Sequence, residues 1–111
     1  MLYPLRGFNQ VRVGERFESA MTMTETHIVM GADLFGDFNR LHVDEAFAAE
    51  SRYGGRIAHG YLTSSLIAAS YGMVFHGTAI AYLEHACRFL KPVHAGDTLT
   101  TVWEITGLTP K

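Results

Sequence analysis

The fold is constrained most by residues 60–74, where apolar side chains fall on every face of a helix. The apolar members of this run are Leu62, Leu66, Ile67, Ala68, Ala69, Met73 and Val74. A helix that is apolar all round is buried by its own protein. The run is also shorter than the roughly 20 residues that a bilayer-spanning helix needs. We therefore expect the rest of the chain to wrap around this helix.

Short predicted elements precede the long helix. Residues 16–24 alternate imperfectly between apolar and polar side chains, which is typical of a strand. Thr24 then caps a predicted helix that Gly36 ends, and Asp44 caps a second, shorter helix that ends at Gly54–Gly55. An irregular segment is predicted between the two helices.

Two further segments with strand character follow the long helix. They cover about residues 79–90 and 98–106, and a turn that contains Pro92 and Gly96–Asp97 joins them. A strand, short helices, a long buried helix and then strands form an α+β order. We expect one domain over residues 1–111, with an antiparallel sheet curled around the central helix.

Composition excludes several classes of protein. With a net charge of -2, the chain lacks the basic surface that nucleic-acid binding needs. Its only cysteine, Cys87, excludes an internal disulfide and a cysteine-built zinc site, and we expect this thiol to be buried in a strand. The sequence has neither a basic-then-apolar leader nor a membrane-length apolar run, so we expect a cytoplasmic protein with no membrane partner.

A carboxylate, an amide and an imidazole fall within the irregular segment, at Asp37, Asn39 and His42. A carboxylate and an imidazole that share one water can hold and exchange protons near neutral pH. Downstream, His59–Gly60 lead into the long helix, where a backbone N–H is oriented to polarise a carbonyl and glycine permits close approach. The residues alone also allow a structural interpretation, in which Asp37 and Asn39 cap a turn and His42 packs.

The spacing Asp-x-Asn-x-x-His, followed later by His-Gly and a helix, resembles that of the MaoC-like dehydratases, also called R-specific enoyl-CoA hydratases. In this chain the matching residues are Asp37, Asn39, His42 and His59–Gly60. A second segment, Phe89 to Thr98, resembles the Phe-x-x-Pro-Val-x-x-Gly-Asp turn of hotdog-fold hydratases. The resemblance covers roughly residues 24–107. It implies the hotdog fold, in which an antiparallel sheet wraps around a long central helix.

The resemblance also implies an activity. It predicts a lyase of fatty acid metabolism that reversibly hydrates trans-2-enoyl thioesters of coenzyme A or an acyl carrier to (R)-3-hydroxyacyl thioesters, without a cofactor or a metal. Asp37 and His42 would activate water, and Gly60 would bind the carbonyl oxygen. Three residues would support them. Asn39 would shape the loop or position the water, and His59 would have a structural role by bonding the polar groups of the loop. Ser65 would hydrogen-bond the catalytic pair.

Other interpretations stay open. Ser65 could equally bond its own helix backbone. A thioesterase of the same fold would use the same helix N–H but aim water at the carbonyl carbon, and a non-catalytic subunit would only bind the acyl thioester. A metal could also be held by Asp37, His42, Asp44 and His59, although their spacing matches no metal motif. The residues do not indicate the acyl chain length, the carrier or the pathway.

Two departures from the family pattern affect these expectations. Arg40 stands where the family usually has proline, so the loop loses a fixed φ. The chain stops at Lys111, where family members usually continue with further strands, and we expect it to be a shortened chain. Its own strands are too few to cover a helix that is apolar all round. We therefore expect at least a homodimer, with the active site near the subunit boundary.

Overall fold

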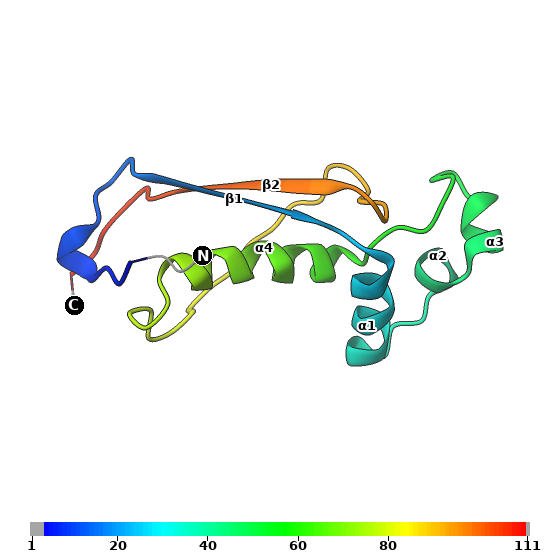
Figure 1. Ribbon diagram of the computed structural model, residues 1–111, viewed down its shortest axis with the longest axis horizontal. Coiled ribbons are helices and arrows are strands. Elements are labelled where there is room, and N and C mark those ends of the chain that lie inside the picture. The colour runs from blue at the N-terminus through cyan, green and yellow to red at the C-terminus, as the bar shows by residue number, and fades with distance from the viewer. Residues whose placement is uncertain (1–3, 111) are drawn as a thin grey trace.

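The computed structural model describes residues 4–110, and a sheet of two strands lies along one side of a long helix (Figure 1). In chain order the elements are η1 (Phe8–Gln10), β1 (Arg16–Thr22), α1 (Glu25–Phe35), α2 (Arg40–Val43), α3 (Glu45–Ala49), α4 (Gly60–Val74) and β2 (Thr98–Glu104). The three short helices gather at the end where α4 begins. The predicted α+β layout is confirmed.

The sheet covers α4 with one of its two faces. β1 and β2 pair antiparallel along their full lengths, from Arg16 opposite Glu104 to Thr22 opposite Thr98. Every second residue of each strand is half-buried, which is the period of a sheet with one covered face. On that face the indole Nε1 of Trp103 donates to the hydroxyl of Ser70 on α4, at 2.7 Å. The contact ties the sheet to the middle of the helix.

The best-packed region lies at the start of α4. Met23, Ile28, Ala58 and Leu62 form the buried core there. The turn between residues 91 and 97 closes over this core, since the backbone N–H of Ala58 donates to the carbonyl of Val93 at 2.7 Å. The backbone of Met23 also bonds the turn, accepting from Gly96 and donating to Asp97. These hydrogen bonds connect the end of β1, the entry to α4 and the turn to one another.

The first helix has the predicted limits. The Thr24 hydroxyl accepts from the backbone N–H of His27, and Gly36 ends α1 in a left-handed conformation with φ 73°. Glycine adopts this conformation without the steric cost that a side chain would add. The next helix, α2, was not predicted, and α3 ends at Ala49 rather than at Gly54–Gly55.

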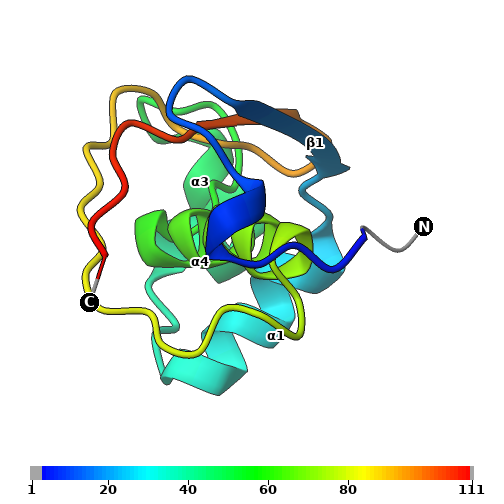
Figure 2. The ribbon, with the colours of Figure 1, turned by 90° about the vertical axis from the view of Figure 1, so that its left-hand side faces the viewer.

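The strand predicted over residues 79–90 is wrong. The described chain forms no ladder there, and Ile80 and Leu83 are 99% and 83% exposed. Viewed along α4, this segment is an irregular trace rather than an arrow (Figure 2). An extended segment becomes a strand only when a neighbour completes its hydrogen bonds. Cys87, expected to be buried here, is exposed for the same reason.

Helix α4 has the predicted limits but is not enclosed. Its buried residues are Leu62, Thr63 and Val74, whereas Tyr61 and Met73 are 44% and 47% exposed. Two strands cover one side of the helix, so the expectation of burial on all sides is wrong for this structure. Among the described residues, no helix is long and apolar enough to span a membrane.

Candidate active site

The loop after α1 is built from short-range hydrogen bonds. A carboxylate oxygen of Asp37, Oδ1, accepts from the backbone N–H of Asn39 at 3.2 Å. The Asn39 side chain in turn accepts from the N–H of Leu41 at 3.0 Å and caps α2. Side chains of Asp and Asn stabilise turns in this way. Asn39 therefore shapes the loop, one of the two roles expected of it.

Arg40 takes the place of the family's proline without disturbing this turn. It is the first residue of α2, and its guanidinium pairs with the carboxylate of Asp44 at 3.1 Å. Asp44 also accepts from the N–H of Phe47 at 3.0 Å and caps α3. Asp44 is therefore occupied as a structural residue and does not reach the other candidate metal ligands.

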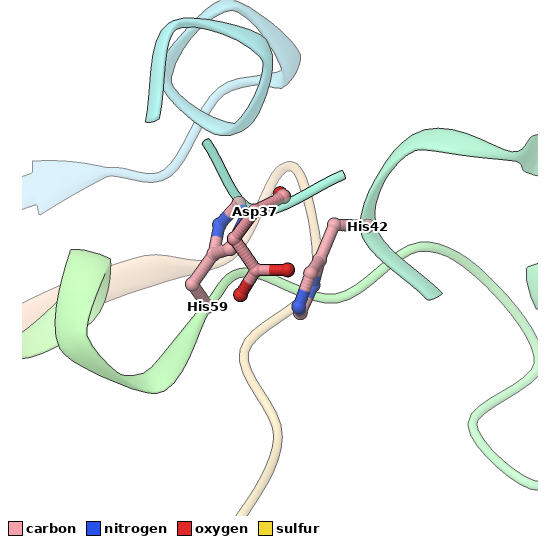
Figure 3. Close-up of side chains that lie close together, drawn as sticks. All are labelled: Asp37, His42 and His59. Carbon is pink, nitrogen blue, oxygen red and sulfur yellow. The ribbon is translucent and has the colours of Figure 1, made fainter. Parts of the chain in front are cut away.

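Asp37, His42 and His59 converge at the entry to α4 (Figure 3). Each offers a nitrogen or oxygen ligand atom, and these three atoms lie within 4.8 Å of one another. Asp37 comes from the loop after α1, His42 from α2, and His59 directly precedes α4. Asp37 and His42 are partly exposed, whereas His59 is only 1% exposed. The structure thus brings together the two residues of the predicted acid/base pair, with the buried His59 next to them.

Backbone carbonyls fix the tautomers of both imidazoles. His42 Nδ1 lies 2.7 Å from the carbonyl oxygen of Ile57. Since a carbonyl only accepts, Nδ1 carries the proton and Nε2 keeps a lone pair. His59 Nε2 likewise donates to the carbonyl of Asp37 at 2.9 Å. In the neutral form of His42, Nε2 is therefore the nitrogen that can take a proton.

The carboxylate of Asp37 accepts two hydrogen bonds from groups of different origin. Its Oδ2 accepts from the hydroxyl of Tyr61, and its Oδ1 from the backbone of Asn39. The bond from Tyr61, followed by that from Asn39, holds the pKa of the Asp37 carboxyl below its usual range. Asp37 in turn raises the pKa of the Tyr61 hydroxyl. Asp37 is therefore ionised at neutral pH, and the Tyr61 hydroxyl donates a hydrogen bond to it.

Sequence reasoning missed Tyr61. A signal for it exists, because helical side chains lean toward the N-terminus of their helix. A residue in the first turn of α4 therefore points back toward the loop that holds Asp37.

Gly60 is the first residue of α4, and its N–H belongs to the helix turn whose donors have no partner within the helix. A Cβ added there would lie 3.1 Å from ring atoms of Phe89. The absence of a side chain at residue 60 therefore makes room for this aromatic ring. Gly60 also lines a cavity of about 370 Å³ with Thr63, Phe89 and the cations Arg52 and Lys91. The volume is in the range of small-molecule sites.

Ser65 does not contact the pair in this structure. Its hydroxyl donates to the carbonyl of Tyr61, one turn earlier in the same helix, at 2.7 Å. This is the alternative that the sequence left open.

The three converging residues fit a metal ion poorly. The rings of His42 and His59 stack at 3.8 Å between centroids, with 29° between their planes. An ion bound by both would have to lie about 2.0–2.1 Å from each nitrogen and close to both ring planes. Rings stacked at this distance and angle do not converge in that way. The arrangement suits proton transfer better.

Residues 9–111 match the family described as MaoC like domain. The chain is 35% identical over 107 residues to the (R)-specific enoyl-CoA hydratase of Rhodospirillum rubrum, covering 96% of this chain and 74% of that protein. It is 33% identical over 104 residues to the 3-hydroxybutyryl-CoA dehydratase of Methylorubrum extorquens, covering 94% of this chain and 66% of that protein.

Solved structures of hydratases are also similar to this chain. The unliganded R-hydratase PhaJ1 from Pseudomonas aeruginosa superposes with a TM-score of 0.88 at 34% identity, over 95% of this chain and 68% of that one. The (R)-hydratase from A. caviae gives 0.82 at 33% identity, over 89% and 75% of the two chains. These neighbours have the hotdog fold, so the fold predicted from the sequence is confirmed.

Proposed function

The chain belongs to the MaoC-like domain family, and on this premise we propose that it reversibly hydrates trans-2-enoyl thioesters to (R)-3-hydroxyacyl thioesters. The two relatives described above are named hydratase and dehydratase, and these names describe the two directions of one lyase reaction. The observation that carries the proposal is the convergence of Asp37 and His42 at the entry to α4.

In the proposed mechanism, one water is held between Asp37 and His42. A carboxylate oxygen has room for a further hydrogen bond beyond the one it accepts here, so Asp37 orients the water. His42 Nε2 takes a proton from it as the oxygen bonds to the β-carbon. The π electrons move toward the thioester carbonyl, and the imidazolium returns a proton to the α-carbon. The sum is one water added, with both residues restored.

Negative charge that develops on the thioester oxygen is stabilised by the start of α4. The N–H of Gly60 is available there, and the positive end of the helix dipole strengthens its effect. The cavity beside Gly60 gives the thioester a place to lie, and Arg52 and Lys91 put positive charge at its wall. The carrier is coenzyme A or an acyl-carrier protein, and the proposed chemistry needs no cofactor.

Crotonyl-CoA tests this proposal against its alternatives. A hydratase removes the absorbance of the conjugated double bond without releasing a thiol. A thioesterase releases free coenzyme A, which a thiol reagent detects. A non-catalytic binding subunit does neither but still binds the thioester. Loss of enoyl absorbance together with formation of (R)-3-hydroxybutyryl-CoA is the expected result. Thiol release, or no reaction with enoyl thioesters, would overturn it.

A further inference from the structure

Tyr61 is held in place by aromatic rings as well as by Asp37. Its ring meets Phe35 edge-on, with centroids 4.9 Å apart and 82° between planes. His59 lies on another side of it, at 5.6 Å and 42°. Although Tyr61 is 44% exposed, these contacts orient its hydroxyl toward the Asp37 carboxylate.

The two hydrogen bonds to the Asp37 carboxylate differ in what they connect. The bond from Asn39 spans two residues and lies within the loop itself. The bond from Tyr61 spans 24 residues and links the carboxylate to the first turn of α4. His59 also links this loop to the entry of α4, but through the backbone carbonyl of Asp37. The Tyr61 hydroxyl therefore ties the carboxylate itself to the helix that begins at Gly60.

We propose that Tyr61 is a positioning residue, whose hydroxyl holds the Asp37 carboxylate in place between His42 and the start of α4. This inference rests on the proposed hydration by Asp37 and His42. It goes beyond that function by naming a residue from α4 that acts through the carboxylate without touching the substrate.

The proposal has a pH signature with a defined sign. Besides the backbone N–H of Asn39, the titratable groups that act on the Asp37 carboxyl are Tyr61 from α4, His59 before it and His42 from α2. The Tyr61 hydroxyl bonds the charged form of the carboxyl, so its removal raises the pKa of Asp37. The acidic limb of kcat/KM then moves to higher pH, because the ionised carboxylate is lost earlier on acidification. A residue that only packed would leave this limb where it is.

The test compares Tyr61→Phe with wild type and with Tyr71→Phe. Tyr61→Phe removes one oxygen and keeps the ring, whereas Tyr71→Phe makes the same change ten residues further along α4. Two quantities are measured: kcat/KM for crotonyl-CoA against pH, and the Asp37 carboxyl titration by carbon-13 NMR without substrate. For Tyr61→Phe we expect kcat/KM at neutral pH to fall roughly ten-fold, as for loss of a hydrogen bond to a charged group. Both titrations should move to higher pH, and Tyr71→Phe should match wild type.

The NMR titration separates this inference from the proposed function. If wild type hydrates crotonyl-CoA but Tyr61→Phe moves neither the acidic limb nor the carboxyl titration, Tyr61 has no positioning role. If wild type hydrates no enoyl thioester while the carboxyl titration still moves, the Tyr61–Asp37 link stands and the function assigned to it fails. Should Tyr61→Phe not fold, Asp37→Asn gives the reciprocal measurement. The Tyr61 hydroxyl should then titrate at lower pH than in wild type, and an unchanged titration would refute the link.

Discussion

The imidazoles of His42 and His59 stack with their centroids 3.8 Å apart, and each is held by a backbone carbonyl. The carbonyl that holds His59 is that of Asp37, and the carbonyl that holds His42 is that of Ile57. The proposed base, His42, therefore stacks on a buried ring that also bonds the backbone carbonyl of Asp37. This arrangement gives His59 a structural part in the site without contact with the substrate.

The role of His59 predicts a graded response to substitution. His59→Leu removes the donor to the Asp37 carbonyl, and a buried polar group left unpaired costs about 1–3 kcal/mol. We expect the free energy of unfolding in urea to fall by that amount and hydration to fall with it. His59→Gln carries an amide N–H toward the same carbonyl and should lose less of both. Equal free energies of unfolding for the Leu and Gln variants would show that the hydrogen bond to the Asp37 carbonyl does not contribute to stability.

The lowered pKa of Asp37 predicts how stability depends on pH. A carboxyl whose pKa is lower in the folded state adds stability above its unfolded pKa, and loses it as pH falls through the folded pKa. The difference in unfolding free energy between wild type and Asp37→Asn should thus be constant at neutral pH. It should shrink in acid, below the ordinary aspartate range. Urea titrations over a pH series measure this, and a difference that grew on acidification would reverse the assigned sign.

Activity should survive exhaustive chelation. The proposed chemistry uses two side chains, a helix N–H and water, and the stacked imidazoles converge poorly on one ion. The measurement is the hydration rate before and after dialysis against a strong chelator, with metal content checked in parallel. A rate that falls on dialysis and returns with one particular ion would make Asp37, His42 and His59 metal ligands instead.

The exposed apolar surface predicts self-association. Ile80, Leu83 and Leu90 are among the most exposed large hydrophobic residues, and the sheet has only two strands and so two open edges. Light scattering should give at least twice the chain mass of 12.3 kDa. Leu83→Lys should weaken the assembly by placing charge on this surface, whereas Glu84→Lys serves as a control for added charge. A folded, active and monodisperse monomer would contradict the prediction.

The features that were predictable from sequence depend on short-range signals. Thr24, Gly36 and the apolar run from residue 60 set the ends of α1 and the extent of α4, and each acts on its own neighbourhood. The Asp37–His42 spacing likewise spans only the loop after α1 and the start of α2. The strand at residues 79–90 was wrong because extended character does not supply a pairing partner. Tyr61 was missed because its bond to Asp37 spans 24 residues and needs the fold to exist.

The central claim is that Asp37 and His42 activate water, and the hydration rate of crotonyl-CoA by matched variants tests it most directly. Asp37→Asn and His42→Ala should each lose about 10²–10⁴-fold in kcat, the usual contribution of a general acid or base, while circular dichroism stays native. Asp44→Asn makes the same chemical change at a residue that caps α3 and pairs with Arg40 but lies outside the cluster of Asp37, His42 and His59. Asparagine caps helices as well, so this variant should keep its activity. Near-normal turnover by either Asp37→Asn or His42→Ala, in a folded protein, would contradict the account.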